Sequence, residues 1–247
     1  LNLEDIREFA DTVELSDVKT LLDTQIKSNM AIAHEGMTGK YGLGIGRVIR
    51  ENYSHDMLTR MRSLTAAASE ARMGGCDMPV VINSGSGNQG ITASVPVIVY
   101  ATELGVDEDT MYRAMALSDL TTIHQKTPIG RLSAYCGAVS AGAGSGAGIA
   151  YLSGASYDEV VHTVINAVAI ISGMVCDGAK ASCAAKIAEA VDAGIIGYYM
   201  AKRGQNFDDG DGIVTAGIEA TIRNVGRLAK EGMKETNDEI ISIMIGS

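Results

Sequence analysis

The hydrophobic positions along the chain repeat at helical intervals. Between positions 18 and 33, apolar residues recur every three or four places, as expected for a helix with one face in the core. Two positions of this stripe, Gln25 and Asn29, are polar. Alternating patterns typical of strands are scarce, and short runs such as 79–82 are too few to build a sheet. The pattern therefore predicts an all-α protein.

Further helices follow from the same periodicity. Ser156 and Glu159 form the pattern of a capping box, directly before an apolar run that ends at Ile171, so a largely buried helix is expected there. The other helices are expected at 57–72, 91–104, 109–120, 184–202 and 213–231. Because no linker, charge block or internal repeat divides the chain, we expect residues 1–247 to form one compact multi-helix domain with Gly-rich loops around its site.

Composition and charge narrow the function. The 247 residues are 46% hydrophobic, enough for a substantial core, and carry a net charge of −10. Nucleic acids and anionic membrane surfaces require a positive face, so neither is expected as a partner, and a small-molecule substrate is left. No apolar run resembles a membrane span or a signal peptide, so we expect a cytoplasmic protein. Because the sequence opens on Leu1, we expect an N-terminal portion of the full-length protein to be missing.

The prolines predict where helices are interrupted. Pro79, Pro96 and Pro128 all lie in the central third of the chain, and two of them flank polar segments rich in Gly or in Thr. Proline removes a helical hydrogen bond, so these segments, including 121–127, are expected to be loops. Function is expected at the same places.

A Gly-rich segment at 83–90 reads Asn-Ser-Gly-Ser-Gly-Asn-Gln-Gly and precedes an expected helix. A loop at a helix N-terminus offers free backbone N–H groups and a favourable dipole, which suit a carboxylate or a phosphate. The Gly-Lys-Ser/Thr ending of a Walker loop is absent, which disfavours nucleotide binding. A connector without a ligand is the alternative. The candidate substrate-binding residues are Ser84, Gly85, Ser86, Gly87, Asn88 and Gln89.

Four cysteines without a secretory signal are expected to stay reduced, which favours metal binding or catalysis over disulfides. Cys136 opens a run of small residues in which each glycine costs about 1 kcal/mol of helix stability relative to alanine. Close helix packing and backbone approach to a bulky inorganic group are two compatible explanations. Cys176 and Cys183 lie seven residues apart, around Gly178. Spacing alone does not distinguish a metal site from buried cysteines.

Three motifs in order resemble the L-cysteine desulfidase family, related to the α-domain of bacterial iron–sulfur L-serine dehydratases. They are the segments 83–90, 133–136 and 176–183, and the resemblance covers roughly residues 29–202. It implies that Cys136, Cys176 and Cys183 ligate a [4Fe–4S] cluster. Three thiolates leave one iron free to act as a Lewis acid. The implied reaction eliminates sulfide from L-cysteine, or water from L-serine, to give pyruvate and ammonia.

The sequence departs from the family at the proposed base. Desulfidases resemble one another in a further cysteine near the N-terminus, which has no counterpart here. Cys76 does not match that motif and is expected to be structural. The candidate catalytic residues are therefore His124 and Lys126, with Arg131 suited to hold a carboxylate in bidentate fashion. His34 is a further candidate.

Two other classes of function are left open by these residues. One is a non-catalytic binding or regulatory module that keeps the dehydratase scaffold. The other is a structural zinc protein, in which the three cysteines and a fourth ligand hold the metal. A homo-oligomer and association with the missing N-terminal portion are both compatible with the sequence.

Overall fold

The computed structural model describes residues 1–246 and confirms the all-α fold. Within this range the β-structure is limited to two isolated bridges. The helices are α1 (Leu3–Thr12), α2 (Leu15–Thr38), α3 (Ile45–Asn52), α4 (Met57–Met73), α5 (Gly87–Leu104), α6 (Glu108–Ile129), α7 (Gly137–Leu152), α8 (Tyr157–Ile171), α9 (Ser182–Ala201), α10 (Ile218–Arg227), the π-helical η1 (Leu228–Gly232) and α11 (Lys234–Ile245). No helix of the described chain is both long and apolar enough to cross a bilayer.

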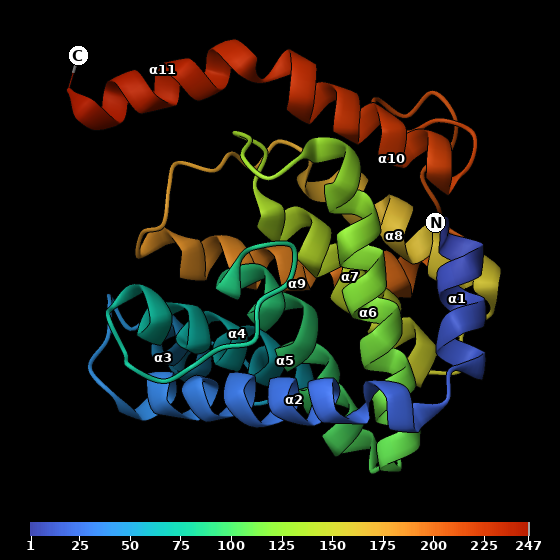
Figure 1. Cartoon of the computed structure of the whole chain (residues 1–247), viewed down its shortest axis with the longest axis horizontal. Coiled ribbons are helices and arrows are strands. Elements are labelled where there is room, and N and C mark those ends of the chain that lie inside the picture. The colour runs from blue at the N-terminus through green and yellow to red at the C-terminus, as the bar shows by residue number, and fades with distance from the viewer. Residues whose placement is uncertain (247) are drawn as a thin grey trace.

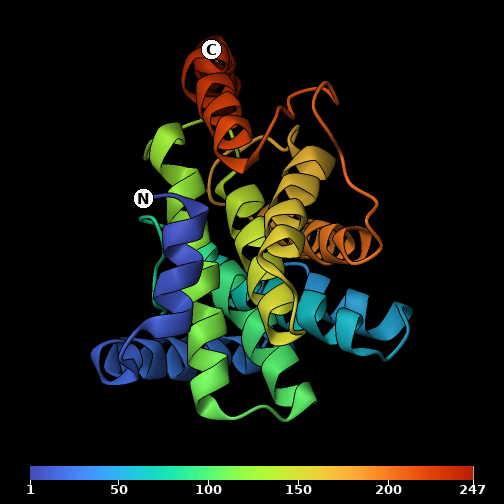
Figure 2. The same cartoon turned by 90° about the vertical axis from the view of Figure 1, so that its right-hand side faces the viewer.

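Helix α7 lies at the centre of the fold, packed against α5, α6, α8 and α9, while α10 and α11 run across one end (Figures 1 and 2). The glycines of α7 lie where neighbouring backbones come close. A Cβ on Gly146 would lie 2.8 Å from the carbonyl oxygen of Gly194 in α9, and one on Gly144 would lie 2.7 Å from that of Ser118 in α6. Side chains at these positions would force the helices apart. Close packing therefore explains the glycine-rich run.

The capping box predicted for α8 is confirmed. The Ser156 hydroxyl accepts a hydrogen bond from the Glu159 N–H at 3.2 Å, and the Glu159 carboxylate accepts one from the Ser156 N–H at 2.7 Å. Two predicted boundaries are wrong, however. Helix α5 begins at Gly87, so the end of the Gly-rich segment is already helical, and residues 213–217 precede α10 instead of forming part of it.

The loop predicted at 121–127 is also wrong, because α6 continues through it to Ile129. The threonines there satisfy their hydroxyls inside the helix: Thr122 donates to the carbonyl of Ser118 at 2.9 Å, and Thr127 donates to that of Ile123 at 2.8 Å. Pro128 lies in the last turn, where a missing N–H costs one bond shortly before the helix ends.

The polar positions in the apolar stripe of α2 hold the chain that leads into the Gly-rich loop. Asn29 is fully buried and exchanges two hydrogen bonds with the backbone of Val81, at 2.9 and 3.3 Å. Gln25 is also buried and donates to the Asp119 carboxylate at 3.1 Å. Segment 79–82 is therefore held by the Asn29 side chain of α2 and not by a sheet.

Candidate active site

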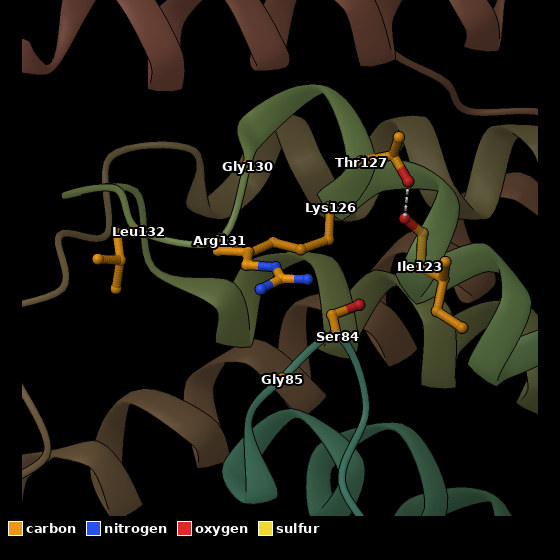
Figure 3. A pocket seen from close by; sticks show the side chains of 8 residues that line it. All are labelled: Ser84, Gly85, Ile123, Lys126, Thr127, Gly130, Arg131 and Leu132. Atoms are coloured by element: carbon orange, nitrogen blue, oxygen red, sulfur yellow. Dashed lines mark hydrogen bonds between the residues drawn. The ribbon is translucent and has the colours of Figure 1, made fainter.

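Two pockets adjoin at the Gly-rich loop. The first, the cysteine pocket, has a volume of about 230 Å³, and its lining includes Arg72, Gly85, Ser86, Asn88, Gln89, Cys136, Cys176, Cys183 and Lys186. The second, the lysine pocket, is an open cavity of about 780 Å³ lined by Ser84, Gly85, Ile123, Lys126, Thr127, Gly130, Arg131 and Leu132 (Figure 3). Because Gly85 borders both, the tip of the loop lies between them.

Three segments bring the cysteines to one pocket. The chain at 134–136 pairs with 174–176: the Cys136 N–H donates to the Met174 carbonyl at 3.1 Å, and the Cys176 N–H donates to the Ala134 carbonyl at 2.6 Å. Cys136 directly precedes α7, and Cys183 lies in the first turn of α9. Thiols that are distant in sequence therefore line a shared space.

The thiols of Cys136 and Cys176 hydrogen-bond to each other. This bond lowers the pKa of Cys176 to about 5, helped by the N–H of Gly178 and by the ammonium of Lys186, whereas the same bond and burial raise the pKa of Cys136. Lys186 is held beside them by the Val175 carbonyl at 3.0 Å. These contacts favour the thiolate form of Cys176, and the thiolate is the form that binds metals.

The donor set fits an iron–sulfur cluster. Throughout residues 1–246, no three His, Cys, Asp or Glu side chains gather around one point as a single metal ion requires. A [4Fe–4S] cluster makes a different demand, because each thiolate binds its own iron. Three thiols on the wall of one pocket meet that demand in the type and number of donors.

The Gly-rich loop is a tight turn at the N-terminus of α5. The backbones of Asn83 and Ser86 exchange two hydrogen bonds, at 3.1 and 3.0 Å. Ser84 between them has φ 49°, a left-handed conformation that no other non-glycine residue of the described chain adopts. The Ser86 hydroxyl caps the helix by accepting from the Gln89 N–H at 3.5 Å. Ser86 and two residues of the first turn of α5, Asn88 and Gln89, line the cysteine pocket.

A carboxylate on α6 anchors this turn. Asp119 accepts a hydrogen bond from the Asn83 side chain at 3.0 Å and one from Gln25 at 3.1 Å, and the same Asn83 amide reaches the Asp119 carbonyl at 3.2 Å. Desolvation by the surrounding protein raises the pKa of Asp119 to about 6, although both hydrogen bonds favour its charged form. The loop is thus fastened to the helix that carries Lys126.

We expect Asp119→Asn to change how stability depends on pH. A carboxyl whose pKa is raised by folding favours the folded state only while it is protonated, so its contribution is lost as the pH rises through about 6. Between pH 5 and pH 8 the wild type should lose roughly 1–1.5 kcal/mol of unfolding free energy that the variant keeps. Denaturant unfolding at the two pH values measures the difference, with Asp77→Asn at an exposed position as the control. Equal pH dependence in wild type and Asp119→Asn would refute this prediction.

Two of the predicted catalytic residues, His124 and Lys126, lie on α6 but point in different directions. Positions two apart in a helix point about 200° apart, so Lys126 and His124 face different surroundings. The His124 Nε2 lies 2.8 Å from the Glu219 carboxylate of α10, and His124 lines neither pocket. Its catalytic role stays a prediction.

Lys126 lines the lysine pocket with only 7% of its surface exposed. Burial lowers the pKa of its ammonium group, whereas the thiols of Cys176 and Cys136 are near enough to act in the opposite direction. Arg131 follows the end of α6, and Figure 3 shows its guanidinium directed toward Ser84. A buried amine and an exposed guanidinium therefore share one cavity beside the loop.

The remaining sequence candidates lie elsewhere. Cys76 is partly buried against the core and hydrogen-bonds to Tyr41. His34 is exposed on α2. Neither lines the cysteine pocket or the lysine pocket.

Sequence reasoning missed two cations of the cysteine pocket. Lys186 lies one helical turn after Cys183 on α9, a spacing that places both on one face and could have revealed it. Arg72 lies in the last turn of α4, which packs against α5 and α9. No local pattern marks Arg72, because only the packing of α4 brings it to the pocket.

The family described as serine dehydratase alpha chain matches residues 2–242. Over 245 residues, 99% of this chain, the sequence is 61% identical to a UPF0597 protein of Desulfitobacterium hafniense and 49% identical to UPF0597 proteins of Finegoldia magna and Lachnoclostridium phytofermentans. The chain spans 57 to 59% of the length of these relatives. No solved structure matches it significantly.

Proposed function

The chain belongs to the serine dehydratase alpha-chain family, and on that premise we propose that it is the cluster-binding part of an iron–sulfur lyase acting on L-cysteine or L-serine. In the reaction, the Cα–H bond and the Cβ–S or Cβ–O bond break, a Cα–Cβ double bond forms, and sulfide or water leaves. Water then converts the aminoacrylate to pyruvate and ammonia. One observation carries the proposal: three thiols and the Gly-rich loop line a single pocket.

Cys136, Cys176 and Cys183 are the proposed ligands of a [4Fe–4S] cluster, which supplies a Lewis-acidic iron without a protein thiolate for the leaving group. Helix N-termini and a lysine near the three cysteines stabilise the negative charge of their thiolates. Cys136 and Cys183 lie at the N-termini of α7 and α9, where helix dipoles stabilise anions. Lys186 adds a positive charge beside the thiols.

The Gly-rich loop is the proposed substrate-binding element. In the first turn of α5, the Gln89 N–H is taken up by the Ser86 cap, while helix geometry leaves the N–H groups of Gly87 and Asn88 without partners in the helix. These groups can hold the substrate carboxylate next to the cysteines. The anchoring of the turn by Asp119 keeps their direction fixed, so binding does not require the loop to become ordered.

Lys126 is the proposed base that removes the α-proton. Its buried position favours the neutral amine, which is the form that accepts a proton. Arg131 lies in the same cavity and adds a positive charge beside the loop, where it can attract the substrate carboxylate.

Anaerobic purification of the full-length protein tests this function. The expected preparation is brown, contains iron and acid-labile sulfide, and forms pyruvate from L-cysteine or L-serine. The substrate with the greater kcat/KM is the physiological class. A colourless protein with stoichiometric zinc would support the structural-zinc alternative, and an iron-loaded protein that forms no pyruvate from either amino acid would support the binding module.

A further inference from the structure

Arg72 is a cation without an anionic partner at the wall of the cysteine pocket. Among residues 1–246 it forms no ion pair, whereas Lys186, the other cation of that wall, is bound to Asp177. Its guanidinium donates to the Asn88 side-chain oxygen at 3.3 Å, which directs it along the first turn of α5. A Cβ on Gly87 would lie 2.3 Å from the Arg72 Nε, so glycine at this position leaves room for the Arg72 side chain as it lies here.

Gln89 is an acceptor without a donor in the same pocket. Only 8% of the residue is exposed, and its side-chain Oε1 is buried with no hydrogen-bond partner in the described chain. A buried polar atom without a partner destabilises the site, so a bound molecule that donates to it gains affinity. Its amide also lies directly against the start of α7, where a Cβ on Gly137 would lie 2.5 Å from Nε2.

These two groups complement the two ends of a free α-amino acid. A guanidinium binds a carboxylate through two parallel hydrogen bonds, and an amide oxygen accepts from an ammonium group. The cysteines form the third side of the pocket. Three contact points in fixed positions select one orientation of a chiral molecule.

We infer that Arg72 and Gln89 determine substrate specificity, Arg72 by binding the α-carboxylate together with the first turn of α5 and Gln89 by accepting from the α-ammonium group. This inference deepens the proposed function and rests on it for the identity of the reaction. It assigns the pocket to free L-α-amino acids with a short side chain. Thiols or carboxylic acids that lack either charged group are poor ligands.

Unreactive ligands test the inference independently of turnover. L-Alanine has both charged groups and no leaving group, L-alaninamide lacks the carboxylate, and propanoate lacks the ammonium. Isothermal titration calorimetry of the iron-loaded full-length protein should show that L-alanine binds at least about 10-fold more tightly than either analogue. The variants are Arg72→Gln and Gln89→Met, with thermal unfolding and iron content as checks on folding.

The two variants should lose different preferences. Arg72→Gln should weaken L-alanine binding about 10- to 100-fold and remove the preference over L-alaninamide, while the preference over propanoate stays. Gln89→Met should do the reverse. If Arg72→Gln does not fold, Asn88→Ala, which releases the guanidinium, should reduce the same preference.

Three results would overturn the inference: no binding of L-alanine to the wild type, unchanged preferences in the folded variants, or equal weakening of all three ligands. Pyruvate formation from L-cysteine and L-serine is measured in the same preparations. If preferences change as expected while the wild type forms no pyruvate, the proposed reaction fails and the assignment of Arg72 and Gln89 stands.

Discussion

Replacing Cys136, Cys176 or Cys183 with Ser, one at a time, is expected to lower elimination activity by more than about 100-fold and to reduce bound iron well below about four atoms per chain. The three thiols line one pocket from three segments, so each change removes a ligand while the packing of α7 against α9 stays. Serine keeps the size of the side chain but binds iron weakly near neutral pH. Iron and sulfide analysis of anaerobically purified variants, with pyruvate assays, measures both effects.

The matched control is Cys76→Ser. This thiol hydrogen-bonds to Tyr41 and lines neither pocket, so the variant should keep its iron and its turnover. If all three pocket variants also kept the iron of the wild type, these cysteines would not be the ligands. If Cys76→Ser alone lost iron, the assignment of the fourth cysteine as structural would be wrong.

Removing the amine of Lys126 is expected to lower kcat by about 100- to 10,000-fold, because general base catalysis contributes that range. Lys126→Met keeps the length of the side chain and its apolar stem, so the buried end of α6 should stay packed. Because Lys126 is not a proposed ligand, iron content should not change. Pre-steady-state pyruvate formation separates a loss in kcat from a loss in substrate affinity.

Two further variants distinguish a base from a mere positive charge. Lys126→Arg keeps the charge but cannot accept a proton near neutral pH, so it should be as impaired as Lys126→Met. His124→Gln changes a residue of the same helix that is paired with Glu219 and borders neither pocket. If His124 has its predicted catalytic role, this variant should also lose turnover, whereas retained turnover would leave Lys126 as the base. Substantial activity in Lys126→Arg would show that charge alone matters there.

The sequence pattern predicted a helix correctly where one face of it is apolar and packs against the core. It failed where the polar side chains of a helix hydrogen-bond to the backbone of that same helix. Helix α8 has its capping box and apolar run as predicted. In α6, the threonine hydroxyls before Pro128 donate to carbonyl oxygens of the same helix. These partners cannot be read from the sequence, so the polar segment was predicted to be a loop. In α2, polar residues interrupt the apolar stripe although the helix is formed as predicted. Asn29 can be buried there because its side chain hydrogen-bonds to the backbone of Val81, a partner that the sequence pattern does not show.

For the site, the motif resemblance predicted residues that share a pocket, but not their separate roles. Cys136, Cys176 and the Gly-rich loop were recognised by their local sequence, and the fold places them together. Arg72 could not be predicted, since a lone arginine at a helix end gives no local signal and its place depends on the packing of α4. The sequence reasoning placed His124 and Lys126 together because it expected a loop there. In the helix that the structure shows, the two side chains point to different sides.

The central claim is that the three cysteines hold a four-iron cluster in which one iron is left for the substrate. Mössbauer spectroscopy of the ⁵⁷Fe-loaded full-length protein tests it most directly, because it resolves iron sites by their coordination. The account predicts that adding L-serine changes the isomer shift of one iron in four and leaves the other three unchanged. A spectrum with no iron–sulfur cluster, or a cluster whose four irons are all unaffected by L-serine and L-cysteine, would contradict it.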